Sequence, residues 1–376
     1  MLMSLLKAIR KRWTLIALVI GNFQARVILA VLYVVLLAPF AGVYSCAMRS
    51  RNAAFESKIL PVGGPDVGII SVGNLSAGGT GKTPIVSLLV GEVTKLGVKC
   101  GIVSRGYGGE TKEPTFVIPD GQATTAKRFG DEPTWLAHRH RDVPVFVGAD
   151  RVATAKKLAS EMKVQLIFAD DAFQHRYLRR EMDIVLLDAT QPRWHYRSLP
   201  LGRLREGFGS LARARHVFLT KTNLAPGDRL QWLRRRVAAE KSGAHFDVHE
   251  FEWIIAGFSQ LGSDAPPAML KRTRVMLVSG IANGAAFADL VRQTIGNADV
   301  AGHVEFADHH RYSTADLERV EKEADRLKVD AIVVTEKDAV KLGGWQPKLP
   351  CLVSQLVARP TGDLRTVYEE FRRLAR

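Results

Sequence analysis

The chain has 376 residues, of which 47% are hydrophobic, and this length and composition predict two folded domains with substantial cores. Its three cysteines, Cys46, Cys100 and Cys351, are far apart, which excludes a disulfide framework and a cysteine-based metal site. The formal net charge is +15. No acidic residue precedes Glu56, so positive charge is concentrated at the start of the chain, at Lys7, Arg10, Lys11, Arg12, Arg26, Arg49 and Arg51.

An apolar segment lies among these basic residues, since residues 27–47 contain no charged side chain. As a helix, this segment is about long enough to cross a hydrocarbon layer of ~30 Å. A cleaved signal peptide fits poorly, because the apolar part is too long. Two interpretations stay open: a core helix of a soluble domain, and a membrane anchor that spans the bilayer or lies in one leaflet. We expect the anchor, although cations on both sides leave its orientation open.

The basic residues themselves have two possible partners. Near a membrane, each Lys or Arg contributes roughly 1 kcal/mol of attraction to anionic headgroups. Nucleic acid is the rival, but the sequence contains no helix-turn-helix, zinc-finger or RNA-binding signature. We therefore expect a membrane and no nucleic acid, and no obligate protein partner is evident.

The most specific local signal is VGNLSAGGTGKTP at 72–84, between an apolar run that predicts a strand and a predicted helix at 85–90. This context is typical of a phosphate-binding loop, although Ser76 replaces the first expected glycine. Glycines let backbone N–H groups surround phosphate oxygens, and the helix N-terminus adds positive potential. A turn that merely needs glycine would leave Gly-Lys-Thr unexplained. We expect ATP to bind at Gly78, Gly79, Thr80, Gly81, Lys82 and Thr83, with the Thr83 hydroxyl on Mg²⁺.

Apolar runs then alternate with helical patterns along the chain. Strands are predicted at 68–72, 98–104, 143–147, 166–169, 184–187 and 217–220. This rhythm predicts a doubly wound, mostly parallel sheet whose ligands bind at the carboxyl ends of the strands. After a connection at 263–267, a second set follows, with strands at 275–279 and 331–334 and helices at 285–295, 314–327 and 363–374.

The predicted fold class is therefore α/β, with a P-loop NTPase-like sheet, a second, smaller α/β domain and an N-terminal membrane helix. We expect the anchor at 1–50, the P-loop core domain at 51–260 and the smaller domain at 261–376.

Carboxylates at element ends are candidates for metal binding and proton transfer. Asp170 and Asp171 end a predicted strand, as in a Walker B motif that holds Mg²⁺; the alternative is an Asp pair that caps a helix. Asp131 begins a predicted helix with Pro133 in its first turn, so it is either a helix cap or a general base for phosphoryl transfer to an alcohol.

Two loops carry further polar groups. The loop around His309 is either plain surface or the source of a histidine that orients a carboxylate across a cleft. The loop 199–206 is either a solvated basic face or a phosphate-binding loop in which Glu206 shares the metal.

Taken together, the chain resembles the tetraacyldisaccharide 4'-kinase family of the Gram-negative lipid A pathway, from roughly Leu36 to the C-terminus. The resemblance is carried by an ordered set of motifs: the loop 72–84, SRGYGG at 104–109, GDEP at 130–133, DDAFQH at 170–175, LRE at 204–206, DHH at 308–310 and TEKDAVK at 335–341. Ala172 replaces a common glycine, and about the first thirty residues extend beyond the family pattern.

The resemblance implies transfer of the ATP γ-phosphate to the 4'-hydroxyl of an acylated disaccharide 1-phosphate, at the cytoplasmic face of the bacterial inner membrane. It implies Asp131 as general base with His309 as its partner in a dyad. The part of the active site that binds Mg²⁺ and the ATP phosphates would be formed by Thr83, Asp170, Asp171 and Glu206. The lipid substrate would meet Arg105, Tyr107, Gln174, His175 and Arg205.

A membrane-associated P-loop ATPase or GTPase, acting as a switch or partner-binding module, is the alternative function. It explains the loop and the Asp pair, but not the pairing of Asp131 with His309.

Overall fold

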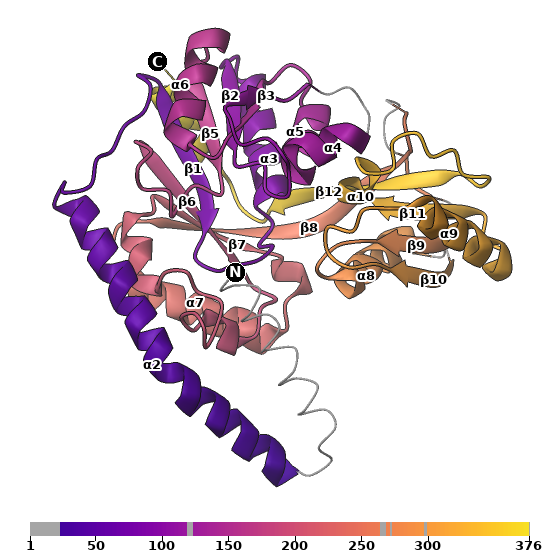
Figure 1. The fold of residues 1–376 in the computed structure, drawn as a ribbon, viewed down its shortest axis with the longest axis horizontal. Helices are drawn as coiled ribbons and strands as arrows, with labels where there is room; N and C mark the ends of the chain where they lie inside the picture. Colours follow the sequence, from indigo (N-terminus) through magenta and orange to yellow (C-terminus); the bar gives the residue numbers. More distant parts are fainter. Residues whose placement is uncertain (1–22, 119–122, 264–267, 271–272, 297–298, 376) are drawn as a thin grey trace. The chain divides into compact units, whose positions relative to one another are not determined.

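The computed structural model describes residues 23–118, 123–263, 268–270, 273–296 and 299–375 (Figure 1). The chain divides into two compact units. The smaller unit comprises Met1–Pro61, Leu75–Gly78 and Gln191–Ser210, and the larger unit comprises Val62–Asn74, Gly79–Thr190 and Leu211–Arg376.

Helix α2, Phe23–Glu56, is the main element of the smaller unit, which also contains the 3-10 helix η1, Arg193–Tyr196. Its part Val31–Glu56 is long and apolar enough to cross a membrane, with a mean hydropathy of 2.0. Only 6% of the apolar window is buried, which fits an anchor better than a core helix. The helix expected at 27–47 is confirmed as a helix, whereas residues 1–22 of the expected anchor lie outside the described residues.

A twelve-stranded sheet forms the centre of the larger unit, in the order β10-β9-β11-β12-β8-β7-β6-β1-β5-β2-β4-β3 (Figure 1). Its neighbours pair in parallel, except β8 with β12 and β3 with β4. The strands are β1 Gly68–Asn74, β2 Cys100–Ser104, β3 Thr115–Phe116, β4 Val145–Val147, β5 Leu166–Asp170, β6 Met182–Asp188, β7 His216–Thr220, β8 Asp247–Gln260, β9 Arg274–Ser279, β10 Asp299–Glu305, β11 Ala331–Thr335 and β12 Cys351–Pro360.

Helices cover both faces of this sheet, as the alternating core residues of β1 show. Ile70 packs in a cluster with residues of α3 and α5, whereas Ile69 packs on the other face with residues of α6. The doubly wound architecture is thereby confirmed. The remaining helices are α3 Lys82–Lys95, α4 Ala123–Phe129, α5 Asp131–Arg139, α6 Arg151–Met162, η2 Phe208–Arg213, η3 Thr222–Leu224, α7 Gly227–Lys241, α8 Gly284–Ile295, α9 Thr314–Leu327, α10 Glu336–Ala339 and α11 Arg365–Leu374.

The predicted strands and helices are all found, with some ends shifted, but β3, β8, β10 and β12 were not predicted. Strand β8 runs without a break to Gln260, pairs in parallel with β7 and pairs antiparallel with β12. The strands expected in two domains thus belong to one sheet, and the domain boundaries at 50 and 260 stay predictions. Most of the expected connection at 263–267 lies outside the described residues.

Candidate active site

The nucleotide-binding loop leads from β1 to α3. Gly81, directly before α3, has a φ of 85°, a left-handed conformation that favours glycine. A Cβ at this position would also overlap the indole ring of Trp253. At Gly79, by contrast, an added Cβ would meet no described atom within 4 Å, so the loop backbone is open there.

Lys82 and Thr83 form the start of α3, where both residues are buried, with 9% and 2% of their surface exposed. The Lys82 Nζ atom lies 3.5 Å from Asp171 Oδ1. The first turn of a helix presents backbone N–H groups without intrahelical partners, and a lysine adds a full positive charge. This end of α3 is therefore built to receive an anion.

Asp170 and Asp171 lie at the carboxyl end of β5, next to β1. Asp170 is buried, and Asp171 turns the chain with a φ of 51°. No helix begins within 171–181, a fully described segment, so the interpretation as a helix-capping pair is wrong. Burial, followed by the nearby charge of Glu132, raises the pKa of Asp170 to about 7. The Asp170 Oδ1 atom has no hydrogen-bond partner in the described part of the chain.

An unpartnered, buried carboxylate oxygen beside Lys82 fits a site that is completed by a cation. Within the described ranges, no cluster of three or more His, Cys, Asp or Glu side chains could hold a metal ion alone. Mg²⁺ characteristically keeps waters and uses one or two carboxylates together with substrate phosphates. Asp170, Asp171 and the Thr83 hydroxyl fit such a partial ligand set.

The Asp131 and His309 side chains are brought together from residues 178 positions apart. His309 Nδ1 lies 2.9 Å from Asp131 Oδ2, and this hydrogen bond raises the pKa of His309. Gly130 is the N-cap of α5, and no side chain caps this helix, so the interpretation of Asp131 as only a cap is wrong. The same contact shows that the interpretation of the His309 loop as plain surface is also wrong.

The His309 loop is held by a buried network. His309 has a φ of 60°, and its backbone N–H donates to the Gly280 carbonyl at 3.1 Å. The Gly280 N–H donates to Asp338 Oδ2 at 3.0 Å, and Asp338 is fully buried. Lys341 Nζ lies 2.9 Å from Asp338 Oδ1 and 3.8 Å from Asp131 Oδ2. These contacts restrain both members of the dyad.

Sequence reasoning missed the roles of Glu132 and Lys337. Lys337 Nζ lies 2.6 Å from Glu132 Oε1, and this ammonium lowers the pKa of Glu132 to about 2. Both residues stand in recognised motifs, Glu132 in GDEP and Lys337 in TEKDAVK, but nothing in either motif shows that the two meet. The pair joins α5 to α10 beside the dyad.

The expected substrate residues of the larger unit have different described surroundings. Tyr107 is 69% exposed, and its ring centroid lies 5.9 Å from that of His309. Arg105 is exposed. Gln174 Nε2 donates to the Asn74 carbonyl at 2.8 Å, and His175 packs edge-on against Tyr177. Tyr107 is thus the member of this group whose contact to the dyad is described.

Gly78, Arg205 and Glu206 belong to the smaller unit. Glu206 is 3% exposed, and its Oε2 accepts hydrogen bonds from Asn52 Nδ2 at 2.6 Å and Ser210 Oγ at 3.0 Å. The Tyr44 hydroxyl donates to the Arg205 carbonyl at 3.1 Å. Glu206 is therefore not part of a solvated basic face. Its role as a metal ligand stays a prediction.

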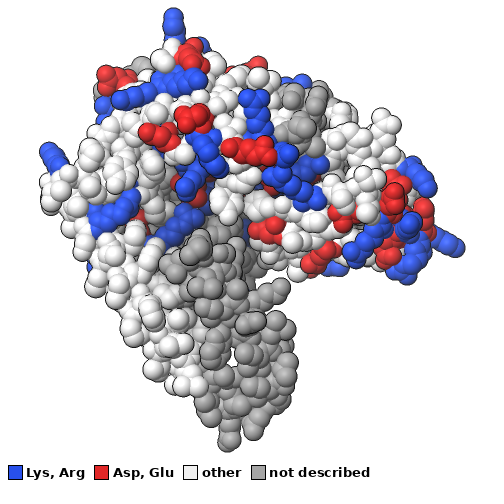
Figure 2. All heavy atoms as spheres, viewed as in Figure 1, with Lys and Arg blue, Asp and Glu red and all other residues white. Residues whose placement is uncertain are grey.

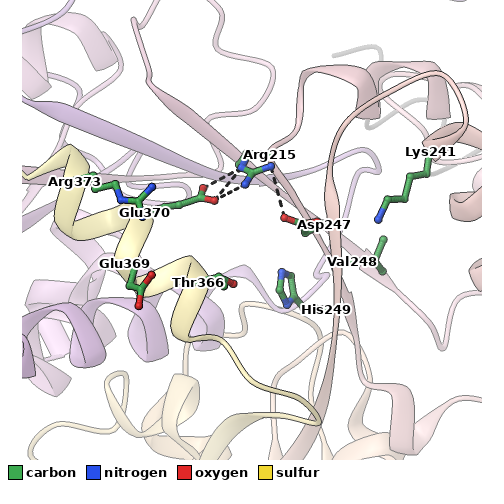
Figure 3. Close-up of a pocket in the computed structure, with 9 residues that line it drawn as sticks. All are labelled: Arg215, Lys241, Asp247, Val248, His249, Thr366, Glu369, Glu370 and Arg373. Atoms are coloured by element: carbon green, nitrogen blue, oxygen red, sulfur yellow. Dashed lines mark hydrogen bonds and ion pairs between the residues drawn. The ribbon is translucent and has the colours of Figure 1, made fainter.

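A separate pocket lies at the amino ends of β7 and β8, the opposite sheet edge from the P-loop (Figure 3). Arg215 forms ion pairs there with Glu370 and with Asp247, the latter at 3.6 Å. Three of the charges that line it, on Arg215, Asp247 and Glu370, pair with one another, and the pocket lies away from the nucleotide-binding loop, so it is not the candidate active site. Elsewhere, on the described part of the face in Figure 2, Lys and Arg are mixed with Asp and Glu and form no continuous basic surface.

Comparisons with known proteins agree with this geometry. Residues 33–371 match the family model described as tetraacyldisaccharide-1-P 4'-kinase. The tetraacyldisaccharide 4'-kinase of Bdellovibrio bacteriovorus is 35% identical over 308 residues, which cover 81% of this chain and 88% of that protein. The protein of that name from Geobacter metallireducens is 33% identical over 318 residues, with coverage of 83% and 89%.

A solved structure is also similar. The crystal structure of LpxK from Aquifex aeolicus in complex with ATP superimposes with a TM-score of 0.71 and covers 90% of this chain and 98% of its own. At 23% identity, this likeness establishes the fold. Together with the family match over residues 33–371 and the relatives above 30% identity, it leads to one conclusion: the chain belongs to the tetraacyldisaccharide-1-phosphate 4'-kinase family.

Proposed function

We propose that this protein transfers the γ-phosphate of ATP to the 4'-hydroxyl of a tetraacyldisaccharide 1-phosphate precursor of lipid A. The observation that carries the proposal is the 2.9 Å contact between Asp131 and His309, in the same unit as Lys82 and Asp171. A nucleotide site alone would suit an ATPase switch. A carboxylate–imidazole pair adds the proton acceptor that an alcohol nucleophile requires.

In this proposal, the loop Gly78–Thr83 binds the phosphates of ATP. Lys82 neutralises the outer phosphates, and Thr83, Asp170 and Asp171 hold Mg²⁺, with Glu206 as a further candidate ligand. The bound ion would neutralise charge that develops on the phosphates. Burial raises the pKa of Asp170 to about 7, and a bound cation would favour the ionised carboxylate.

Within the dyad, the geometry favours His309 as the group that takes the hydroxyl proton. Its side chain is 38% exposed, whereas that of Asp131 is 16% exposed and lies between His309 and Lys341. With Nδ1–H donated to Asp131, Nε2 carries the lone pair that accepts the proton. Asp131 then orients the imidazole and stabilises its cation. This revises the sequence-based assignment of Asp131 as the base.

The substrate and the apolar helix fit together. An acylated acceptor resides in a membrane, and α2 offers an uncharged surface from residue 31 to 48 that suits the bilayer. We propose that α2 anchors the protein at the cytoplasmic face of the inner membrane, where ATP is present. Arg105, Tyr107, Gln174, His175 and Arg205 are the candidate contacts to the lipid headgroup.

The function is tested by incubating the full chain in detergent with ATP, Mg²⁺ and the disaccharide 1-phosphate. We expect one phosphorylated lipid for each ATP consumed, and no consumption without the acceptor. Lys82→Ala should abolish both signals while the thermal unfolding midpoint stays close to that of the unaltered protein. ATP hydrolysis that is independent of the lipid would instead support an ATPase switch.

The anchor is tested separately by deleting residues 1–47. The shortened protein should leave the membrane fraction and lose activity on lipid in bilayers, while ATP binding persists. Sedimentation of the shortened protein with membranes would show that another surface attaches it.

A further inference from the structure

The carboxyl end of β7 contacts the nucleotide-binding loop through two side chains. Thr220 Oγ1 donates to the Thr80 carbonyl at 3.0 Å, and Lys221 Nζ donates to the Gly79 carbonyl at 3.4 Å. We propose that Lys221, held by Asp188, is a positioning residue that sets the orientation of the Gly79–Thr80 peptide for binding nucleotide phosphate. The inference rests on the proposed use of ATP.

The argument follows from the geometry of the peptide unit. A trans peptide is planar, and its C=O and N–H groups point in opposite directions. When Lys221 holds the Gly79 carbonyl, the Thr80 N–H must point to the other side of the loop. When Thr220 holds the Thr80 carbonyl, the Gly81 N–H is directed in the same manner. The two tethers thus orient consecutive N–H groups, as a phosphate-binding loop requires.

Gly79 is the position where such a tether matters most. An added Cβ there would meet no described atom within 4 Å, so side-chain packing does not fix this residue. Glycine populates both signs of φ with similar ease, so its peptide can rotate at little cost. Gly81 differs, because Trp253 packs directly against it. A hydrogen bond to the carbonyl is therefore the restraint that acts on Gly79.

Lys221 is itself held for this contact. Its Nζ atom lies 2.6 Å from Asp188 Oδ2, and the Asp188 side chain is fully buried at the end of β6. Asp188 Oδ1 accepts hydrogen bonds from the Thr190 N–H at 3.0 Å and the Thr190 hydroxyl at 2.6 Å. The carboxylate therefore cannot move with the lysine, and it anchors the ammonium beside the loop.

The backbone of Lys221 has an unusual conformation. Its φ is 60°, which a residue with a side chain adopts at a cost of roughly 1–2 kcal/mol. Such conformations persist where the surroundings demand them. Here β7 ends at Thr220, and the turn at Lys221 returns the side chain toward the loop.

The test measures ATP affinity by calorimetry, with Mg²⁺, on the full chain in detergent. Lys221→Met should weaken ATP binding by about tenfold or more, the effect of losing a hydrogen bond to a charged group. Asp188→Asn should weaken it similarly, and the double variant should be little worse than either single variant, since both act through one contact. Lys95→Met, at an exposed position of α3, is the matched control and should bind like the unaltered protein.

A positioning role also predicts which kinetic constants change. The KM for ATP should rise in Lys221→Met, while the KM for the lipid and the thermal unfolding midpoint change little. Hydrogen exchange at the Thr80 amide should quicken in the nucleotide-free protein. Equal ATP affinity in Lys221→Met and the control would overturn the inference. Normal affinity in Asp188→Asn would also overturn it, because Lys221 would then act without its anchor. If the unaltered protein binds no ATP, the proposed function itself fails.

Discussion

The Lys337 ammonium lies 2.6 Å from the Glu132 carboxylate and joins the first turn of α5 to α10. Glu132 directly follows Asp131, so this ion pair restrains the helix end that carries the dyad carboxylate. Lys337 is also one of the charges that lower the pKa of His309. The pair therefore affects both the geometry and the titration of the dyad.

Lys337→Met should reduce kcat by about 10- to 100-fold, since small displacements of reacting groups are costly. It should destabilise the protein by roughly 1–2 kcal/mol, because Glu132 loses its partner in a partly exposed pair. Thermal unfolding and steady-state kinetics measure the two effects. Lys322→Met on α9 is the exposed control. Adding Glu132→Gln to Lys337→Met should restore stability, and a further loss would contradict the pairing.

Asp131→Asn and His309→Ala should each lower kcat by about 10²- to 10⁴-fold. The double variant should be little worse than the poorer single variant, because the two residues act as one unit. Losses that track unfolding, or that multiply independently, would remove the dyad from the mechanism.

The pH profile gives a second test of the dyad. The hydrogen bond to Asp131 raises the pKa of His309, and only the neutral imidazole accepts a proton. Activity should therefore be present above this raised pKa and be lost as the pH falls through it. In Asp131→Asn, the acidic limb of kcat/KM should move to lower pH. In Lys337→Met it should move to higher pH, because a nearby positive charge is removed. An unchanged limb in both variants would contradict His309 as the base.

Asp170→Asn should inactivate the enzyme and yet stabilise it in the absence of Mg²⁺. Burial raises the pKa of Asp170 from 3.8 to about 7, so the folded state retains a proton that the unfolded state loses. Stability therefore falls as the pH rises from 4 toward 7, by roughly 2–4 kcal/mol, and Asn removes this cost. Denaturant unfolding at pH 8 measures the gain, and lower stability of the variant there would contradict the account.

Acid stability should depend on His216 at the start of β7. Burial lowers the pKa of this fully buried histidine from 6.5 to about 4, so the unfolded state binds the proton more readily. Stability is complete above pH 6.5 and falls as the pH drops toward 4, by up to roughly 3 kcal/mol. His216→Gln should move acid unfolding to lower pH, whereas His245→Gln, at an exposed site, should not. Identical acid transitions in both variants would refute this role.

The elements that were predicted correctly carry strong local signals. The loop 72–84 combines glycine chemistry with a flanking strand and helix, and α9 was predicted at its observed bounds, 314–327. Strand β8 was missed because many of its residues are polar and half-buried. Its extended conformation depends on pairing with two other strands, β7 and β12. Long-range pairing leaves little trace in a local pattern.

The same limit applies to the site. Asp131 and His309 were paired through the family resemblance, and the contact is present in the structure. The contacts of Glu132 with Lys337 and of Lys221 with Gly79 join positions more than a hundred residues apart. Spacing along the chain does not encode such contacts, because they arise when the fold brings helix starts and strand ends from distant segments together.

The most direct test of the account is the position of the new phosphate. The lipid product formed with ATP and Mg²⁺ can be examined by two-dimensional ¹H–³¹P NMR, with the reaction of Lys82→Ala as the blank. The account predicts a new phosphorus signal that correlates with the proton on C4', besides the signal of the 1-phosphate. A new phosphorus signal that correlates with any other sugar proton, or inorganic phosphate as the sole new product, would contradict it.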